Sequence, residues 1–203
     1  MNSYSEKSVK SYFDYYGKLW HQQNMLQDHV RTSTYNTAIL QNKSDFLGKV
    51  VMDVGAGSGI LSFFSAQAGA SKVYAVEASN ASEVIRTLAA APTNASFGQQ
   101  VTVVPRLLET ISDAEVPRSS VDVLVSEPIG TLLFNERMIE TYLRARDRFL
   151  KPGGKMFPNA ATLFVAPFSD QVLWDEERNR GSFWKQKFYD IDMSPAQKRL
   201  TPS

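Results

Sequence analysis

The sequence predicts an α/β fold in which a doubly wound, mostly parallel sheet is flanked by helices. Two observations support this prediction. Short β-branched runs alternate with helical stretches, and this alternation requires crossover connections that produce parallel strands. A glycine-rich loop joins the first of these runs to a helix, as in open sheets that bind ligands at the ends of their strands. The chain has 203 residues, 43% of them hydrophobic, which suits one such domain with a small appendage.

The N-terminal segment has the pattern of a helix. Residues 8–40 contain no proline and no glycine except Gly17, and their apolar residues recur at mostly three- and four-residue steps. That spacing predicts one or two amphipathic helices. Residues 48–70 are then expected to form a strand, a glycine-rich turn and a helix of small residues that Gly69 closes.

Three more strands follow along the chain. The second is expected at Lys72–Ser79, and a helix follows from about Ala81 to Ala91, where Pro92 stops it. The run QVTVVPRLLE (100–109) predicts the third strand, and VDVLVSEP (121–128) predicts the fourth.

The C-terminal part predicts a last helix, a last strand and the start of a second unit. The helix is expected at 134–150 and ends at Lys151-Pro152-Gly153-Gly154. The run KMFPNAATLFVAPF (155–168) resembles a fifth strand region. Beyond it the chain is rich in aromatic residues and shows little periodicity, which indicates that a different unit begins there.

Composition argues against several classes of protein. The formal net charge is +1, so no overall field attracts nucleic acid or an anionic membrane. The sequence has no cysteine, no N-terminal apolar run of the secretory kind and no apolar stretch of about 20 residues, the length of a membrane span. His21 and His29 lack the spacing of metal ligands. We therefore expect a soluble intracellular protein without a metal.

The loop Asp53–Gly59 predicts a ligand of the nucleotide kind. Its glycines let the backbone approach a ligand closely, and Glu77 ends the second strand, where a carboxylate accepts hydrogen bonds from both ribose hydroxyls. This pattern fits either NAD or S-adenosylmethionine. Ile60 stands where the dinucleotide fingerprint has glycine or alanine, and Asp53 would repel a pyrophosphate but attract an ammonium group. Both features favour S-adenosylmethionine, which carries no phosphate.

Three further acids follow predicted strands. Glu109 ends the third strand and would accept a hydrogen bond from an adenine amino group, although taken alone it is more often a solvated loop acid. Glu127 and Glu136 enclose a mostly apolar stretch after the fourth strand. Taken alone, Glu136 is typical of an acid in the first turn of a helix, which the helix dipole stabilises.

The sequence resembles the protein arginine methyltransferases, in particular their coactivator-associated subgroup. Four stretches carry the resemblance and cover nearly all of residues 11–170: YFDYYGKLWHQQNMLQDHVRTSTYNTAIL, VMDVGAGSGILSFFSAQAGASKVYAVEAS, VDVLVSEPIGTLLFNERM and LKPGGKMFP. The proline after the first glutamate of the third stretch, and QQNM in the first, are typical of the subgroup. The resemblance implies a Rossmann-like S-adenosylmethionine-dependent methyltransferase fold, with N-terminal helices and the start of a truncated β-barrel.

The resemblance also implies a role for individual residues. Glu127 and Glu136 would be the catalytic pair that grips a substrate arginine, and Tyr16 and Met25 would border that substrate site. Arg31 would pair with the methionine carboxylate of the cofactor. The full set implied to bind the cofactor is Tyr12, Phe13, Gln22, Arg31, Asp53, Gly55, Gly57, Glu77 and Glu109.

Two carboxylates suit this chemistry. A guanidinium has a pKa above roughly 12 and is therefore protonated and a poor nucleophile at physiological pH. Paired carboxylates on one loop hold its planar fork, localise the positive charge on one side and leave the other nitrogen free to attack a methyl group. Catalysis would then consist of positioning and electrostatics.

The chain departs from the family pattern at two positions of this loop and in its length. Ile129 and Thr131 stand where the family usually has methionine and tyrosine, which changes the wall of the substrate site. Family enzymes continue into a β-barrel with a dimerisation arm. We therefore expect a helical cofactor lid at 1–45, the S-adenosylmethionine-binding domain at 46–154 and an incomplete barrel and arm at 155–203. Such a chain is expected to bind the cofactor more readily than it turns over a peptide.

Three functions remain open from the sequence. The first is a protein-arginine N-methyltransferase that makes monomethyl and asymmetric dimethyl arginine from S-adenosylmethionine, with S-adenosylhomocysteine as the second product. The second is an inactive S-adenosylmethionine-binding module, and the third, which Ile60 disfavours, is a nicotinamide oxidoreductase. By resemblance, the substrates would be histones and transcription or RNA-binding proteins, in the nucleus and cytoplasm. A full-length homodimer without direct contact to nucleic acid or membrane is expected.

Overall fold

The computed structural model describes residues 14–199. The chain separates into two compact units that divide between Leu163 and Phe164. Within residues 14–199, no helix combines the length and the apolar character that crossing a lipid bilayer requires.

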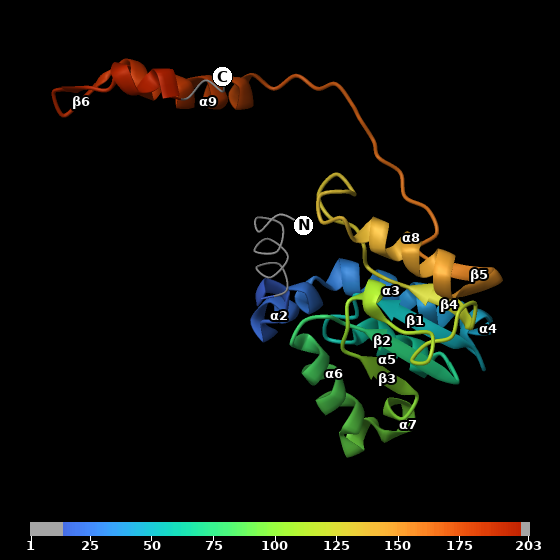
Figure 1. Ribbon diagram of the computed structural model, residues 1–203. Helices are drawn as coiled ribbons and strands as arrows, with labels where there is room; N and C mark the ends of the chain where they lie inside the picture. Colours follow the sequence, from blue (N-terminus) through green and yellow to red (C-terminus); the bar gives the residue numbers. More distant parts are fainter. Residues whose placement is uncertain (1–13, 200–203) are drawn as a thin grey trace. The chain divides into compact units, whose positions relative to one another are not determined.

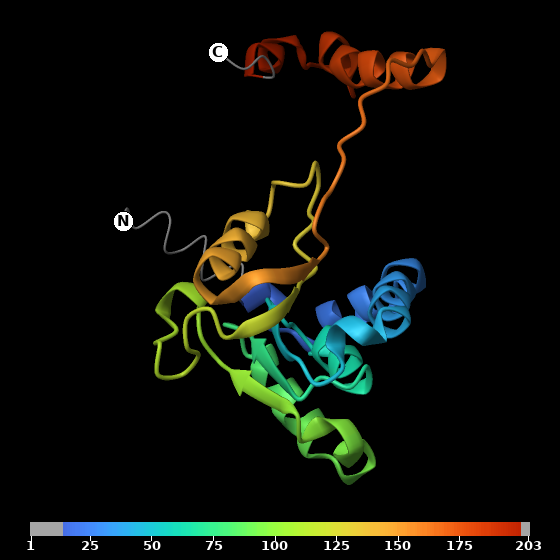
Figure 2. The ribbon, with the colours of Figure 1, turned by 90° about the vertical axis from the view of Figure 1, so that its right-hand side faces the viewer.

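The first unit is built on a five-stranded parallel sheet, as the sequence predicts. The strands are β1 (Val50–Val54), β2 (Lys72–Val76), β3 (Val101–Val104), β4 (Val121–Val125) and β5 (Leu150–Phe157). Their order is β3-β2-β1-β4-β5, and every pair is parallel (Figures 1 and 2). The strand order reverses between β1 and β4. In open sheets of this kind the ligand lies at that point, beyond the carboxyl ends of the strands.

Helices cover both faces of the sheet. The N-terminal segment forms α2 (Leu19–Gln27), α3 (His29–Gln41) and α4 (Lys43–Phe46), and the crossovers contain α5 (Ile60–Gln67), α6 (Ala81–Ala90), α7 (Ala95–Gly98) and α8 (Met138–Phe149). Short 3-10 turns lie at Pro92–Asn94 (η1) and Leu108–Thr110 (η2). Residues 19–41 thus contain two helices separated at Asp28, within the span 8–40 that the sequence predicts to form one or two helices.

Alternating residues of the strands form a core on each face. Met52 and Val54 of β1 pack in one buried cluster with Phe149 of α8, whereas Val51 packs in another with Ile39 of α3. All of these side chains are at most 1% exposed. The period of two in β1 therefore places α8 on one face of the sheet and α3 on the other.

Two predicted elements differ from the structure in the region after β4. The last helix of the unit begins at Met138, not at residue 134, because Arg137 adopts a positive φ angle of 59° that interrupts a helix. Lys151-Pro152-Gly153-Gly154 does not end the helix but lies inside β5. The ladder shifts register there, since Val121 pairs with Leu150 and Val123 with Lys155.

The strand expected at 155–168 ends at Phe157. Pro158 follows directly, and proline cannot donate the N–H that a strand ladder needs. Residues 158–170 contain no helix or strand, and Phe164 and Val165 there are 87% and 91% exposed.

The second unit contains a helix that the sequence analysis did not predict. This helix, α9 (Gln171–Ser182), begins after Asp170, whose side chain accepts a hydrogen bond from the Leu173 N–H. An acid at the N-cap is a recognisable start signal, but the lack of apolar periodicity obscured the helix. The 3-10 turns η3 (Phe183–Lys185) and η4 (Ser194–Arg199) flank a hairpin of β6 (Lys187–Phe188) and β7 (Ile191–Asp192).

Candidate functional site

The loop after β1 requires glycine at two positions because other side chains approach its backbone. Gly55 and Gly57 have positive φ angles of 73° and 55°. A Cβ atom on Gly55 would lie 2.6 Å from Cε of Met138, and one on Gly57 would lie 2.7 Å from Oε1 of Gln22. Alanine at either position would therefore be strained and would collide with a neighbour. The glycines hold the loop between the start of α8 and the N-terminal helices.

Glu77 is fixed by the backbone at the end of β2. Its Oε2 accepts a hydrogen bond from the Gly57 N–H at 2.8 Å, and its Oε1 accepts one from the Ser79 N–H at 2.7 Å. The residue is 7% exposed. Each carboxylate oxygen has a second lone pair. The carboxylate is thus held in one orientation with acceptor capacity for two hydroxyl groups.

Gln22 connects the N-terminal helices to the same loop. Its Oε1 accepts a hydrogen bond from the Ser58 N–H at 2.8 Å, and its Nε2 donates to the carbonyl oxygen of Tyr16 at 2.8 Å. The residue is 4% exposed. Both ends of the amide are therefore used, and Tyr16 is held close to the glycine loop.

The two acids after β4 are both engaged by other side chains. Arg31 Nη2 donates to Glu127 Oε2 at 2.8 Å, and the side chains are only 27% and 24% exposed. The Tyr16 hydroxyl hydrogen-bonds with Glu136, and burial and the charge of Glu136 raise the pKa of Tyr16 to about 12. The hydroxyl therefore keeps its proton at neutral pH and can donate it to the carboxylate.

Gly130 allows the loop to bring Glu136 back toward Glu127. A Cβ atom there would lie 2.2 Å from Oδ1 of Asn135 and 2.9 Å from Cγ of Glu136. A bridge between Gly130 and Leu133 closes the turn. Ser126, the residue before Glu127, is fully buried and donates its hydroxyl to the Val54 carbonyl at 2.7 Å. The loop is thus anchored to β1 at its start and folds tightly at its centre.

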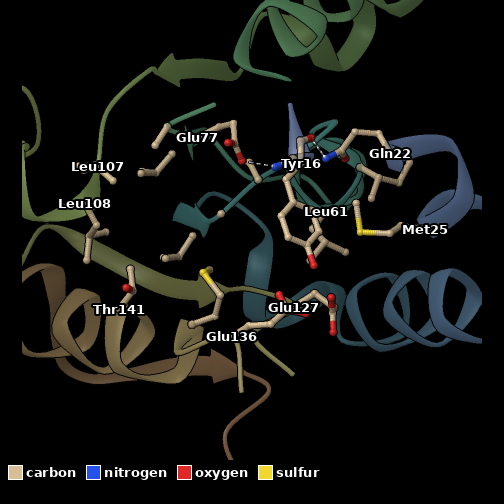
Figure 3. Close-up of a pocket in the computed structure, with 18 of the residues that line it drawn as sticks. Tyr16, Gln22, Met25, Leu61, Glu77, Leu107, Leu108, Glu127, Glu136 and Thr141 are labelled. Atoms are coloured by element: carbon tan, nitrogen blue, oxygen red, sulfur yellow. Dashed lines mark hydrogen bonds between the residues drawn. The ribbon is translucent and has the colours of Figure 1, made fainter. Parts of the chain in front are cut away.

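The glycine loop, Gln22, Glu77, the Arg31–Glu127 pair and the Tyr16–Glu136 pair line one cavity of about 380 Å³ at the carboxyl ends of the strands. Figure 3 shows Glu77 on one side and Glu127 and Glu136 on another, with the Tyr16 hydroxyl pointing toward the two acids. The predicted site residues that line the cavity are Tyr16, Gln22, Met25, Arg31, Gly55, Gly57, Glu77, Glu109, Glu127 and Glu136. Tyr12 and Phe13 lie outside the described residues.

Asp53 is the described site residue that is not part of the cavity lining. It is fully buried beneath the loop, where Ser62 Oγ donates to its Oδ2 at 2.7 Å and its Oδ1 has no hydrogen-bond partner among the described residues. Burial raises its pKa to about 7. Any effect of Asp53 on a ligand would therefore act through the loop or through water.

Glu109 lines the cavity but also forms an ion pair at its rim. Its Oε1 accepts a hydrogen bond from Arg144 Nη1 at 3.2 Å. The side chain is 38% exposed, so the pair is weak and leaves the carboxylate accessible.

The cavity also contains residues of α8 and residues just before Glu109 that the sequence did not indicate. Leu108, Met138 and Thr141 line it, together with Arg106 and Leu107. Met138 and Thr141 are three residues apart on the first turn of α8, so they share one face. Both residues lie inside the helix predicted at 134–150, but no sequence pattern marks them as cavity residues.

Comparison with protein-family models supports a methyltransferase. A model described as ribosomal protein L11 methyltransferase (PrmA) matches residues 28–156. This range contains the glycine loop, Glu77 and both acids after β4, which are the main elements of the cavity.

A curated relative gives a more specific match. A probable histone-arginine methyltransferase CARM1 from Oryza sativa subsp. indica is 56% identical over 189 residues, which make up 93% of this chain and 35% of that protein. The chain thus spans about a third of the length of that relative.

Solved structures agree with the sequence comparison. Protein arginine methyltransferase 10 of Arabidopsis thaliana, in an open conformation, matches with a TM-score of 0.77 and 40% identity over 92% of this chain and 54% of that one. The Trypanosoma brucei PRMT1 enzyme-prozyme complex with AdoHcy matches with a TM-score of 0.77 and 35% identity over 91% of this chain and 55% of that one. The cavity and these similarities agree, and the chain belongs to the protein arginine methyltransferase family.

Proposed function

We propose that the chain binds S-adenosylmethionine and supplies the paired acids of a protein-arginine N-methyltransferase. One observation carries this proposal. The glycine loop with Glu77 and the acids Glu127 and Glu136 line the same cavity. A nucleoside bound by Glu77 and a cation bound by the two acids would therefore adjoin each other, as methyl transfer from S-adenosylmethionine to arginine requires.

The residues present fit the cofactor. A volume of about 380 Å³ lies within the usual range for small-molecule sites, roughly 300–1,000 Å³. Glu77 would accept hydrogen bonds from the two ribose hydroxyls, and Glu109 would accept one from the adenine amino group. Arg31 provides a guanidinium for the methionine carboxylate. Tyr12 and Phe13 would close over the adenosine.

The cofactor would supply a methyl group activated by a positively charged sulfur atom. The protein would bind and orient the acceptor. Glu127 and Glu136 would hold the guanidinium of an arginine side chain through charge-assisted hydrogen bonds, which are stronger where water is excluded. Tyr16 would orient Glu136, and Met25 would restrict the space beside the reacting nitrogen.

The names of relatives support the class of substrate. The rice relative is named as a histone-arginine methyltransferase, and so is a Drosophila ananassae relative that is 51% identical over 194 residues. Protein substrates such as histones, a nuclear role and mono- and asymmetric dimethyl arginine products follow as part of the proposal. The proposal further includes transcription or RNA-binding proteins as substrates, a cytoplasmic pool of the protein and a full-length homodimer.

The proposal also assigns parts of the chain. Residues 1–45 would form the lid over the cofactor, residues 46–154 the cofactor-binding domain, and residues 155–203 the start of a barrel and its dimerisation arm.

Transfer of radiolabelled methyl groups tests the proposal. The chain, and a longer protein that continues it to the length of its relatives, would be incubated with labelled S-adenosylmethionine and an arginine-rich histone. We expect label on arginine in the longer protein, and loss of it in Glu127→Gln. Binding of the cofactor without label in either protein would instead support a non-catalytic binding module, which the unusual Ile129 and Thr131 of the loop favour.

A further inference from the structure

Arg31 and Glu127 were expected to serve different ligands, but the structure joins them. Arg31 was expected to bind the cofactor carboxylate and Glu127 to bind the substrate guanidinium. Arg31 Nη2 instead donates to Glu127 Oε2 at 2.8 Å, across 96 residues of sequence. Both side chains line the cavity, and both are about three-quarters buried. A guanidinium belonging to the protein thus already contacts the acid that is proposed to hold a guanidinium from the substrate.

The position of Arg31 disfavours a purely structural role. It lies in the first turn of α3, where its N–H donates to the N-cap Asp28 at 3.0 Å. The dipole of a helix disfavours a cation in this turn and favours an anion. A structural ion pair gains nothing from this placement, whereas a site for a carboxylate gains from both the guanidinium and the helix N-terminus.

The guanidinium can serve two carboxylates. Its Nη2 contacts Glu127, and its Nη1 donates to the carbonyl oxygen of Met25 at 3.3 Å. The fork has five N–H donors, so these two contacts do not exhaust it. A cofactor carboxylate can therefore bind the same guanidinium as Glu127 does, but the single positive charge of Arg31 is then shared by two anions.

Neighbouring groups do not supply a second positive charge for Glu127. Burial raises the pKa of Tyr35, which is also affected by the charges of Glu127 and Arg31, so its hydroxyl is neutral at physiological pH. The pKa of Tyr16 is raised as well. Arg106, which also lines the cavity, pairs with Glu115 at 2.6 Å. Within residues 14–199, Arg31 is therefore the cation on which the charge balance of Glu127 depends.

We propose that Arg31 is the residue that couples the two halves of the site, because cofactor carboxylate and substrate guanidinium alter the same ion pair from opposite sides. When a cofactor carboxylate binds Arg31, the attraction between Arg31 and Glu127 becomes weaker. The repulsion between Arg31 and an incoming substrate guanidinium becomes weaker as well. A guanidinium that binds Glu127 in turn increases the attraction of Arg31 for the carboxylate. Thermodynamic linkage makes the two effects equal, so each ligand strengthens the binding of the other. This inference rests on the proposed function and deepens it.

A comparison of two nucleosides measures the contribution of the amino-acid group, with its carboxylate, to binding. S-adenosylhomocysteine carries the amino-acid group, whereas 5′-methylthioadenosine has the same adenosine and sulfur but no carboxylate. Calorimetry with the 203-residue chain would give both dissociation constants. The quantity of interest is their ratio, that of 5′-methylthioadenosine over that of S-adenosylhomocysteine, which reports how strongly the amino-acid group is bound.

Glu127→Gln imitates the neutralisation of Glu127 by a bound guanidinium. We expect it to raise the ratio about fivefold or more, within the range typical of coupled sites. Arg31→Gln should bring the ratio close to one. Glu136→Gln is the matched control, because it removes the same charge from the same loop without touching Arg31, and it should change the ratio by less than half as much.

The outcomes separate the inference from the proposed function. A ratio that is unchanged or lower in Glu127→Gln would show that Glu127 merely holds Arg31 in place, and would overturn the coupling while cofactor binding stands. An equal rise in Glu136→Gln would assign the effect to general charge and would also overturn it. If the wild-type chain binds neither nucleoside, the proposed function itself fails.

A blocked Gly-Arg-Gly peptide gives the reciprocal measurement. Its affinity should be about fivefold or more higher with saturating S-adenosylhomocysteine than with saturating 5′-methylthioadenosine, by the same linkage. In Arg31→Gln this difference should disappear. Equal affinities in the wild-type chain, or a difference that persists in Arg31→Gln, would contradict the coupling.

Discussion

At the scale of single residues, the site depends on side chains that hold other functional groups in place. Glu77 is oriented by two backbone N–H groups, and Gln22 links the glycine loop to Tyr16. Such prior ordering reduces the entropy that a ligand must lose when it binds. The sequence shows which residue types are present, but these contacts arise only when distant segments meet.

Gln22 is expected to stabilise both the fold and the cofactor site. Gln22→Ala leaves the buried Ser58 N–H without its acceptor, which should lower the free energy of unfolding by roughly 1–3 kcal/mol. The affinity for S-adenosylhomocysteine should fall as well, because the loop loses its attachment to the N-terminal helices. Urea unfolding and calorimetry measure the two effects. Gln23→Ala is the control, since Gln23 is exposed on the same helix, and equal losses in both variants would contradict this role.

Asp53 predicts a dependence of stability on pH. Its pKa rises from 3.8 to about 7 on burial. Between these values the folded state retains a proton that the unfolded chain has lost, so the contribution of Asp53 to stability is full below pH 3.8 and is lost as pH rises through about 7. Asp53→Asn removes this pH-dependent contribution to stability, because asparagine does not titrate. Relative to the wild type, the variant should gain stability between pH 4.5 and pH 7.5 in urea unfolding, and a constant difference would contradict the assignment.

At the scale of elements, the loop between β4 and α8 determines how the two acids meet. Gly130 lies against Asn135 and Glu136, and Leu132 and Leu133 have left-handed backbone conformations. Non-glycine residues rarely adopt such angles, and they persist where the surrounding structure enforces them. The loop therefore has a defined shape that its apolar composition alone does not indicate.

Gly130→Ala should disturb the acids while leaving the cofactor site intact. The new Cβ would lie 2.2 Å from Asn135 Oδ1 and 2.9 Å from Glu136 Cγ, so Glu136 must move. We expect a loss of stability of about 1–3 kcal/mol, as for overpacked sites, with affinity for 5′-methylthioadenosine unchanged within about twofold. Gly153→Ala is the comparison, because a Cβ there meets no atom within 4 Å and only its φ of 77° is strained. A crystal structure of Gly130→Ala with Glu136 in its original position would contradict the prediction.

The sequence predicted the sheet well and the segment after β4 less well. The β-branched runs and the glycine loop are local signals, and β1 to β4 follow them, whereas β5 (Leu150–Phe157) has no β-branched residue and overlaps the predicted strand only at residues 155–157. The predicted start of α8 at residue 134 is wrong because a pattern of apolar residues continues through the loop, while the positive φ angle of Arg137 interrupts the helix. The ion pair between Arg31 and Glu127 had no sequence signal, because no local pattern shows which acid meets which base across 96 residues.

At the scale of the whole molecule, the cavity belongs entirely to the first unit. Every residue that lines it lies before Leu163, and the buried clusters of the sheet also lie within that unit. Cofactor binding should therefore depend on the first unit alone.

A chain that ends at Leu163 tests this separation. It should bind S-adenosylhomocysteine with a dissociation constant within about twofold of that of the 203-residue chain, because its pocket and its apolar core are the same. Circular dichroism would confirm that it folds, and calorimetry would give the affinity. A loss of more than about tenfold, in a folded protein, would show that residues after 163 take part in the site.

The central claim is that this cavity binds the nucleoside of S-adenosylmethionine through Glu77. Calorimetric titration of the chain with S-adenosylhomocysteine tests it most directly, with Glu77→Ala in parallel. We predict one site in the wild-type chain and an affinity at least about tenfold lower in Glu77→Ala, since the variant loses hydrogen bonds to a charged acceptor worth roughly 1.5–3 kcal/mol. Absence of binding at millimolar ligand, or equal affinity in the two proteins, would contradict the account.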